Sequence, residues 1–201
     1  MTWYIIRHAE KHYGGFYDSY LRHQNEPITD RGKDQAEALI HYFSGKPISA
    51  VYVSQYLRTL QTGAPLAQHF KLTPIVDQQL NEIDNGLIDG LKEEEIQARF
   101  PEVWKGFAER NTDFRFPEGE TGEEAMKRIA DFIEEKRTRH EGQDIVAFSH
   151  EGLIRLLGCH ILKLPVYKRW NFQVDFCGIM ELTYQPDFNE WKLIRFNHTV
   201  G

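Results

Sequence analysis

Short, nearly continuous apolar runs recur along the chain, and such runs are typical of strands that are buried on both faces. Three of them cover residues 2–6, 50–53 and 145–148. Two later apolar segments, 179–184 and 191–196, predict a hairpin or two strands that close a sheet. These runs are the expected strands of one central sheet.

Amphipathic segments lie between these runs and predict helices. Apolar residues at helical spacing cover 31–43, 55–70, 122–139 and 151–162. Pro65 lies inside the second segment and predicts a kink or a break, because proline removes a backbone hydrogen bond. Thr121 followed by Glu124 has the form of a capping box, so we expect a helix to begin at residue 122.

The segment from about residue 83 to residue 120 breaks this alternation. It is rich in glycine and proline and contains two short helical stretches, near 92–100 and 102–110. We interpret it as a lid-like excursion. The whole pattern predicts a single α/β domain over 1–201, with a mostly parallel central sheet flanked by helices and a helical lid insertion.

Composition and charge restrict the class of protein. Apolar residues make up 41% of the 201 positions and aromatic residues 13%, which is too many for a disordered chain. The 30 acidic residues exceed the 24 Lys and Arg, giving a net charge of −6, so we expect no nucleic-acid partner. Cys159 and Cys177 are too few for a disulfide framework or a four-sulfur zinc site, and we expect both to be buried.

Targeting and membrane-spanning segments are not expected. Residues 1–7 lack the basic region and the long apolar stretch of a signal peptide. The most apolar later stretch, 153–164, is interrupted by Arg155, His160 and Lys163, so we expect no membrane span and no membrane partner. A cytoplasmic protein is predicted, and no oligomeric state is indicated.

Polar and titratable residues directly follow three of the predicted strands. Arg7 and His8 follow the first strand, Arg58 lies one helical turn beyond the second, and His150 follows the third. Singly, each is more often an ordinary hydrogen-bonded or solvated residue. The carboxyl ends of parallel strands meet at one edge of a sheet, however, so these side chains are expected to converge. Because arginine forks match phosphate oxygens, the cluster predicts a ligand that carries a phosphate.

The same residues carry a family resemblance. The sequence Arg7-His8-Ala9-Glu10 resembles the Arg-His-Gly-Glu signature of the histidine phosphatase superfamily, whose fold is phosphoglycerate mutase-like. Further segments resemble those of the family in the same order, at 26–36, 54–62, 81–91, 116–121 and 149–152.

The resemblance implies a role for each residue of the cluster. His8 would be the nucleophile and become a phosphohistidine, and nearby arginines would favour its unprotonated form. Arg7, Arg58 and His150 would bind the phosphoryl oxygens, on which charge resides as the P–O bond breaks.

The resemblance also implies a proton donor. Glu82 would protonate the leaving alkoxide and then act as the base towards the water that hydrolyses the phosphohistidine. Asp84 is the alternative donor. With cations positioned around the phosphoryl group, we expect no metal and no cofactor.

Three positions differ from the family pattern. Ala9 replaces the usual glycine after the histidine, and Gly14 stands where the family often places an asparagine that contacts phosphate. Lys11, His12 or a backbone amide of the Gly14-Gly15 turn are the candidates to replace it. Glu151 stands where glycine is common, and we expect its charge to favour a protonated His150.

Two segments are expected to form the walls of the pocket. The loop 11–25 carries Tyr13, Phe16, Tyr17 and Tyr20, which either contact an organic leaving group or pack the loop down. The excursion, with Lys105, Arg110 and Arg115, would form the opposite wall.

The resemblance implies a phosphomonoester hydrolase whose partner is a small-molecule phosphate monoester. One alternative is a cofactor-dependent phosphoglycerate mutase, a group with an Glu-Arg-His-Tyr-Gly segment after the acid region. Residues 82–86 read Glu-Ile-Asp-Asn-Gly and lack that arginine and histidine, which favours the phosphatase branch. Another alternative is a non-catalytic module that binds phosphorylated ligands, but such a module is expected to have lost His8, Glu82 or the arginines.

Overall fold

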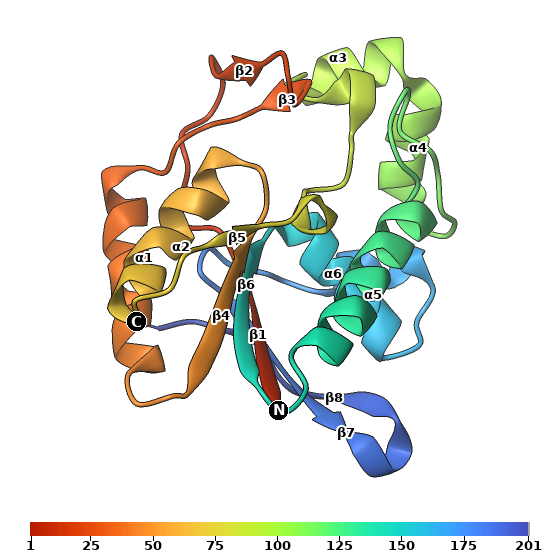
Figure 1. The fold of residues 1–201 in the computed structure, drawn as a ribbon. Coiled ribbons are helices and arrows are strands. Elements are labelled where there is room, and N and C mark those ends of the chain that lie inside the picture. Colours follow the sequence, from red (N-terminus) through yellow and green to blue (C-terminus); the bar gives the residue numbers. More distant parts are fainter. Residues whose placement is uncertain (201) are drawn as a thin grey trace.

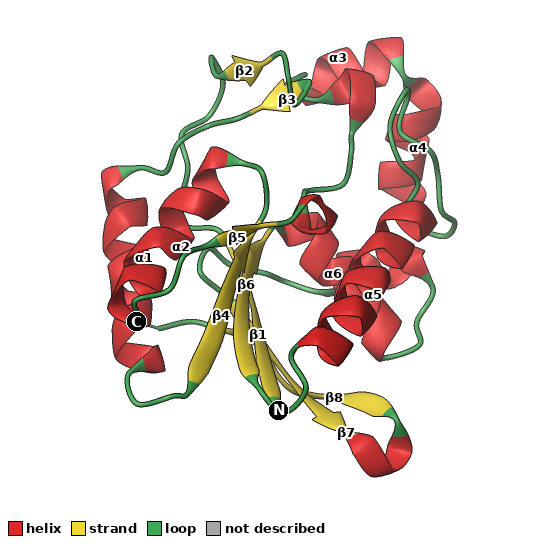
Figure 2. Cartoon of the chain, in the orientation of Figure 1, coloured by secondary structure: helices red, strands yellow, loops and turns green. Residues whose placement is uncertain are grey.

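A six-stranded sheet runs through the computed structural model, which describes residues 1–200 (Figures 1 and 2). The strand order is β5-β4-β6-β1-β7-β8. Neighbouring strands among the first four are parallel, and β7 and β8 are antiparallel to their neighbours, which confirms the mostly parallel sheet and the C-terminal hairpin. The strands are β1 (Thr2–Arg7), β4 (Ile48–Val53), β5 (Ile75–Val76), β6 (Asp144–Ser149), β7 (Ile179–Gln185) and β8 (Glu190–His198).

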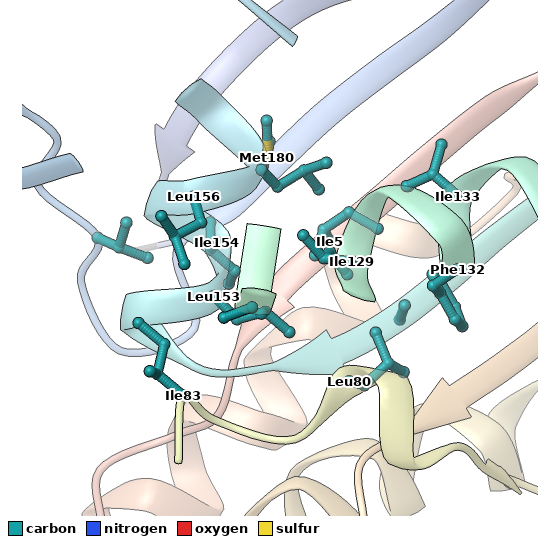
Figure 3. Packing of buried hydrophobic residues seen from close by; sticks show 14 of the residues in the cluster. Ile5, Leu80, Ile83, Ile129, Phe132, Ile133, Leu153, Ile154, Leu156 and Met180 are labelled. Carbon is teal, nitrogen blue, oxygen red and sulfur yellow. The ribbon is translucent and has the colours of Figure 1, made fainter. Parts of the chain in front are cut away.

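Two helices cover each face of this sheet, so the molecule has three layers (Figure 1). In β1, Tyr4 and Ile6 pack towards α1 and α2, whereas Trp3 and Ile5 pack towards α5 and α6, as the alternation of side chains in a strand requires. Figure 3 shows the cluster of buried residues between the sheet and helices α5 and α6, which includes Ile5 of β1 and Ile129 of α5. The four helices are α1 (Asp30–Phe43), α2 (Leu57–His69), α5 (Gly122–Arg139) and α6 (Glu151–Ile161).

The helix starts agree with the capping residues in the sequence. Thr29 caps α1 by accepting a hydrogen bond from the N–H of Gly32 at 3.0 Å. Thr121 and Glu124 form the expected capping box at the start of α5. Of the expected kink or break at Pro65, the break is wrong, because α2 runs from Leu57 to His69 as one helix. Buried residues on both sides of Pro65 hold this helix against the sheet, and that packing outweighs the missing hydrogen bond.

Smaller elements lie beyond the carboxyl ends of the parallel strands (Figure 1). They include a short hairpin of β2 (Tyr17–Asp18) and β3 (His23–Gln24), and the helices α3 (Glu93–Arg99) and α4 (Pro101–Glu109), which confirm the two helical stretches of the excursion. The four 3₁₀ turns within residues 1–200 are η1 (Gln78–Leu80), η2 (Gly86–Ile88), η3 (Val166–Asn171) and η4 (Pro186–Phe188).

The structure also bears on the expectations about the cysteines and about membrane-spanning helices. Cys159 and Cys177 are both buried and carry free thiols, as predicted. Over residues 1–200, none of the helices has the length and apolar character that crossing a membrane would require.

Candidate active site

His8 follows the last residue of β1 and is buried, with 3% of its surface exposed. Its backbone N–H donates to the carbonyl oxygen of Ser149 at 3.0 Å, and its Nδ1 lies 2.8 Å from the carbonyl oxygen of Ala9. A carbonyl only accepts, so Nδ1 carries the proton and Nε2 carries the lone pair. Burial, with a smaller contribution from the charge of Arg58, holds the pKa of His8 well below its usual 6.5. His8 is therefore neutral at neutral pH.

His150 is completely buried beside His8, and the centroids of the two rings are 5.3 Å apart. The Nε of Arg58 donates to Nδ1 of His150 at 3.2 Å. The proton of His150 therefore resides on Nε2, which donates to the hydroxyl oxygen of Ser54 at 2.8 Å. Burial and, to a lesser degree, the charge of Arg58 hold the pKa of His150 well below 6.5. Both ring nitrogens are engaged, so His150 orients Arg58 in this structure.

Arg58 lies in the first turn of α2 and is 6% exposed. Its Nη1 donates to the carbonyl oxygen of Gln24 at 3.1 Å and to Oε2 of Glu26 at 3.4 Å. The guanidinium stacks over the ring of Tyr56, 4.2 Å from its centroid. These contacts fix the guanidinium in one orientation beside the two histidines.

Arg7, the last residue of β1, enters the cluster from the other side. Its Nη1 donates to the carbonyl oxygen of Val174 at 2.6 Å, and the guanidinium stacks over Phe176 at 4.2 Å. Its Nε is buried and has no hydrogen-bond acceptor within residues 1–200. A buried donor of this kind is suited to a negatively charged oxygen.

The expectation that Glu151 favours a protonated His150 is wrong. The carboxylate of Glu151 pairs with Nη2 of Arg7 at 2.9 Å and with Arg155. Its charge is therefore compensated by two arginines, Arg7 of β1 and Arg155 of α6. Burial and the charge of Arg58 are the largest influences on the pKa of His150, and both lower it.

Glu82 receives hydrogen bonds from the first turn of α6. Its Oε2 accepts from the N–H of Gly152 at 3.2 Å, and its Oε1 accepts from the N–H of Leu153 at 3.1 Å. The N–H of Ile83 also donates to Oε1, at 2.9 Å. The carboxylate thus satisfies donors that a helix start leaves unpaired. Glu82 also lies near enough to Arg58 for its charge to act on the pKa of that guanidinium, which burial lowers and Glu82 raises.

Asp84, the alternative proton donor, is held elsewhere. Its Oδ1 accepts from the N–H of Gly86 at 2.8 Å and lies 3.2 Å from Nε2 of His23. The other nitrogen of His23, Nδ1, lies 3.4 Å from a carboxylate oxygen of Asp89. This geometry places Asp84 in a local turn, whereas Glu82 is bound to the first turn of the helix that directly follows His150.

A cavity of about 540 Å³ opens beside this cluster. Tyr56 and Glu82 belong to both the cavity wall and the cluster, since Tyr56 also packs edge-on against His150 at 5.0 Å. The rest of the wall is mostly polar and includes Gln79, Asp84 and Glu120. An organic group attached to a phosphate at His8 has room here.

The expected walls of the pocket are confirmed only in part. Tyr20 is 86% exposed and lines the cavity, and the other aromatic residues of the loop are exposed too, so the alternative in which they pack the loop down is wrong. Lys105 and Arg115 instead line a separate hollow beside α4, and Arg110 stacks on Trp170. Glu120, at the end of the excursion, does line the cavity, together with Arg128 of α5, which the sequence did not indicate.

The structure brings the five predicted site residues to one edge of the sheet. Three further residues position them, and the sequence indicated no role for these three. Thr62 accepts from the N–H of Ala9 at 3.0 Å, and Arg128 donates to the carbonyl oxygens of Gln79 and Asn81 beside Glu82. Glu26 pairs with Arg58, and the sequence signal for it is its place at the start of the 26–36 segment that resembles the family.

Residues 1–200 contain no group of three or more His, Cys, Asp and Glu side chains arranged to hold a metal ion. The charges that act on the pKa of His8 are those of Arg58, Arg7 and Lys11.

A comparison of the sequence with known families agrees with this geometry. The profile of the histidine phosphatase superfamily (branch 1) matches residues 3–199. The chain belongs to the histidine phosphatase superfamily. Among curated members, this histidine phosphatase is 31% identical over 173 residues to phosphoserine phosphatase 1 of Hydrogenobacter thermophilus, covering 85% of the chain and 81% of the relative.

More distant members have different names. A probable phosphoglycerate mutase of Enterobacter sp. is 27% identical over 189 residues, which cover 90% of the chain and 84% of the relative. The crystal structure of the alpha-ribazole phosphatase from Shigella flexneri superposes with a TM-score of 0.82 at 21% identity, covering 100% of this chain and 98% of that one. At that identity the likeness shows the shared phosphoglycerate mutase-like fold.

Proposed function

We propose that this histidine phosphatase hydrolyses a small phosphorylated metabolite through a phosphohistidine intermediate on His8. The observation that carries the proposal is the state of His8, which is buried and neutral with its Nε2 lone pair free. It lies among Arg7, Arg58 and His150, groups that can neutralise a phosphoryl dianion.

In the first step, Nε2 of His8 attacks phosphorus and the bond to the leaving oxygen breaks. Protonated Glu82 gives its proton to that oxygen, so the product leaves as an alcohol. Arg58 and Arg7 bind the phosphoryl oxygens. Nδ1 of His150 accepts from Arg58 in this structure, so it must gain a proton before it can donate to a phosphoryl oxygen, and the charge of the phosphate favours that gain.

In the second step, water attacks phosphorus and the P–N bond breaks. The carboxylate of Glu82 takes a proton from the water, which restores protonated Glu82 and releases inorganic phosphate. The three backbone N–H groups that donate to Glu82 satisfy its ionised form and hold it in place for this step.

The cavity favours hydrolysis over the mutase reaction. A mutase must retain a second phosphate, which calls for cations at the far end of the pocket. This wall instead carries Glu82, Asp84 and Glu120, and its arginine, Arg128, forms two hydrogen bonds of 2.8 and 2.9 Å with Glu120. Such a wall suits a leaving group with hydroxyl or amino groups. Phosphoserine, which the name of the relative from Hydrogenobacter gives as its substrate, carries an amino group for such a wall and a carboxylate for Arg128, and is a first compound to assay.

The test is release of phosphate from p-nitrophenyl phosphate, phosphoserine and a panel of phosphorylated metabolites. His8→Ala is expected to lower kcat by about 10³-fold or more, because it removes the nucleophile. Glu82→Gln is expected to lower kcat by about 10²- to 10⁴-fold. Brief incubation with ³²P-labelled substrate and denaturation at alkaline pH should leave label on the wild type and none on His8→Ala.

Two outcomes would contradict the proposal. Rapid interconversion of 2- and 3-phosphoglycerate without phosphate release would indicate a mutase. Full activity of His8→Ala would rule out the phosphohistidine route.

A further inference from the structure

Gly14 occupies the position where this family often has a phosphate-binding asparagine, and it lies in solvent. Residues 12–17 are all exposed, and no atom lies within 4 Å of a Cβ built on Gly14, whose φ is +71°. His8 is buried, by contrast. The Gly14-Gly15 turn and the exposed His12 are therefore poorly placed for a phosphoryl group on His8, which leaves Lys11 among the candidates.

Lys11 lies on the inner side of this loop. Its side chain is 17% exposed, and its Nζ is 2.6 Å from Oε1 of Glu26. A backbone bridge to Ile28 fixes the start of the loop next to the segment that leads into α1. The charge of Lys11 is also one of the causes that lower the pKa of His8, as expected for a cation near the nucleophile.

Glu26 connects Lys11 to Arg58. Its side chain is only 4% exposed, and its second oxygen, Oε2, lies 3.4 Å from Nη1 of Arg58. A carboxylate this deeply buried is stable only when cations or hydrogen bonds compensate it. Here one carboxylate faces two cations, so the three side chains together carry one excess positive charge.

A phosphoryl group would compete with the carboxylates of the pocket. Arg7 is paired with Glu151, whereas Lys11 and Arg58 share Glu26. A phosphoryl dianion brings two charges and several strong acceptor oxygens to the same donors. The flexible stem of lysine allows its ammonium group to turn from one acceptor to another without backbone movement.

Building on the proposed function, we propose that Lys11 binds the phosphoryl group in place of the missing asparagine. Glu26 is a positioning residue in this proposal. It holds Lys11 and Arg58 beside the nucleophile and competes with the phosphoryl group for both.

The experiment is a calorimetric titration of the folded protein with inorganic phosphate, which does not depend on turnover. Lys11→Met keeps the length of the side chain and removes its charge. We expect it to raise the Kd of phosphate about ten- to a hundredfold, the range for loss of a hydrogen bond to a charged group. Lys11→Arg should stay within about threefold of the wild type. Glu26→Gln should lower the Kd several-fold, because a competing anion is removed.

Lys33→Met is the matched control, because Lys33 is an exposed lysine of α1 that pairs with Asp30. Its phosphate affinity and turnover should equal those of the wild type. In turnover, Lys11→Met should raise KM more than it lowers kcat, since the contact exists before and during the reaction. Glu26→Gln should instead lower kcat more than it raises KM, because the cations remain present but are less well fixed beside the nucleophile.

The sign of the two effects decides the matter. An unchanged Kd in folded Lys11→Met, or a rise in Kd of the same size in Glu26→Gln, would overturn the proposal. If Lys11→Met does not fold, the direction of the change in Glu26→Gln decides it alone. A wild type that binds phosphate through Lys11 but hydrolyses no ester would contradict the proposed function and leave this inference standing.

Discussion

The position of Glu82 depends on the absence of a side chain at residue 152. The N–H of Gly152 donates to one carboxylate oxygen of Glu82, and a Cβ on Gly152 would lie 2.7 Å from the other. Carboxylate and backbone can approach this closely only because residue 152 is glycine. The same glycine lies in the first turn of α6, directly after His150 and Glu151.

Gly152→Ala is therefore expected to displace Glu82 and to lower kcat about ten- to a hundredfold, because small misplacements of a reacting group are costly. Thermal stability should also fall, because the new Cβ would lie 2.9 Å from the side chain of the buried Ile83, and the better helix propensity of alanine offsets only part of that loss. The measurements are kcat and the melting temperature. Gly158→Ala is the control in the same helix, where the nearest atom to the new Cβ, in the side chain of Phe196, is 3.3 Å away. Equal kcat values for Gly152→Ala and the wild type would refute the positioning argument.

At the residue scale, the sequence predicted which residues make up the site better than it predicted the contacts between them. His8, Arg58 and His150 follow strand ends, and strand ends are visible in the apolar pattern. The contact of Glu82 with α6 joins residues 70 positions apart, and no local pattern encodes it. The role of Glu26 was missed for the same reason, because its partner Arg58 lies 32 positions further along the chain, in α2.

At the scale of elements, His23 connects the β2–β3 hairpin to the segment that follows Glu82. It lies between Asp84 and Asp89, and a carboxylate oxygen of Asp89 also accepts from the N–H of Gln24 at 2.7 Å. The hydrogen bond with Asp89, aided by the charge of Asp84, raises the pKa of His23, although burial and Arg22 oppose the rise.

The raised pKa gives this contact a definite pH dependence. The folded protein binds the proton of His23 more tightly than the unfolded chain, so protonation stabilises the contact. This contribution is fully present below about pH 6.5, the ordinary value for histidine, and is lost as the pH rises through the raised folded-state value. Amides of 17–24 should therefore exchange more slowly at about pH 6 than at about pH 8.5, after correction for intrinsic rates.

His23→Gln should abolish this difference, whereas His12→Gln, a change at an exposed histidine of the same loop, should preserve it. Exchange that is independent of pH in the wild type would disprove the role of His23.

The long elements were predictable, and the short ones were not. Helices such as α5 span several turns, so their apolar spacing and capping box are visible in the sequence. β2, β3 and β5 have two residues each, which is too short for any periodicity. The helix break expected at Pro65 does not occur for a different reason, because packing of α2 against the sheet overrides the local preference of proline.

At the scale of the whole molecule, a net charge of −6 coexists with a cationic site. Arg7, Lys11 and Arg58 gather at one edge of the sheet, where Glu151 pairs with Arg7 and Glu26 is shared by Lys11 and Arg58, so three cations face two carboxylates. The bulk charge therefore says little about the charge of the ligand. Arginine and lysine side chains can neutralise a phosphoryl group in the way that a divalent metal does in other enzymes.

Metal removal tests whether side chains alone supply the positive charge of the site. We expect dialysis against EDTA to leave kcat/KM within about twofold of the untreated enzyme, because side chains supply the positive charge. The measurement is hydrolysis of p-nitrophenyl phosphate with and without added Mg²⁺ or Zn²⁺. Loss of activity that either metal restores would show that a metal takes part.

The N-terminus of helix α6 positions two side chains of the site, His150 and Glu82. His150 immediately precedes it, and the carboxylate of Glu82 is bound to its first turn. A displacement of α6 relative to β1 would therefore move both groups together. The distance between His150 and Glu82 would then change less than the distance from either of them to His8.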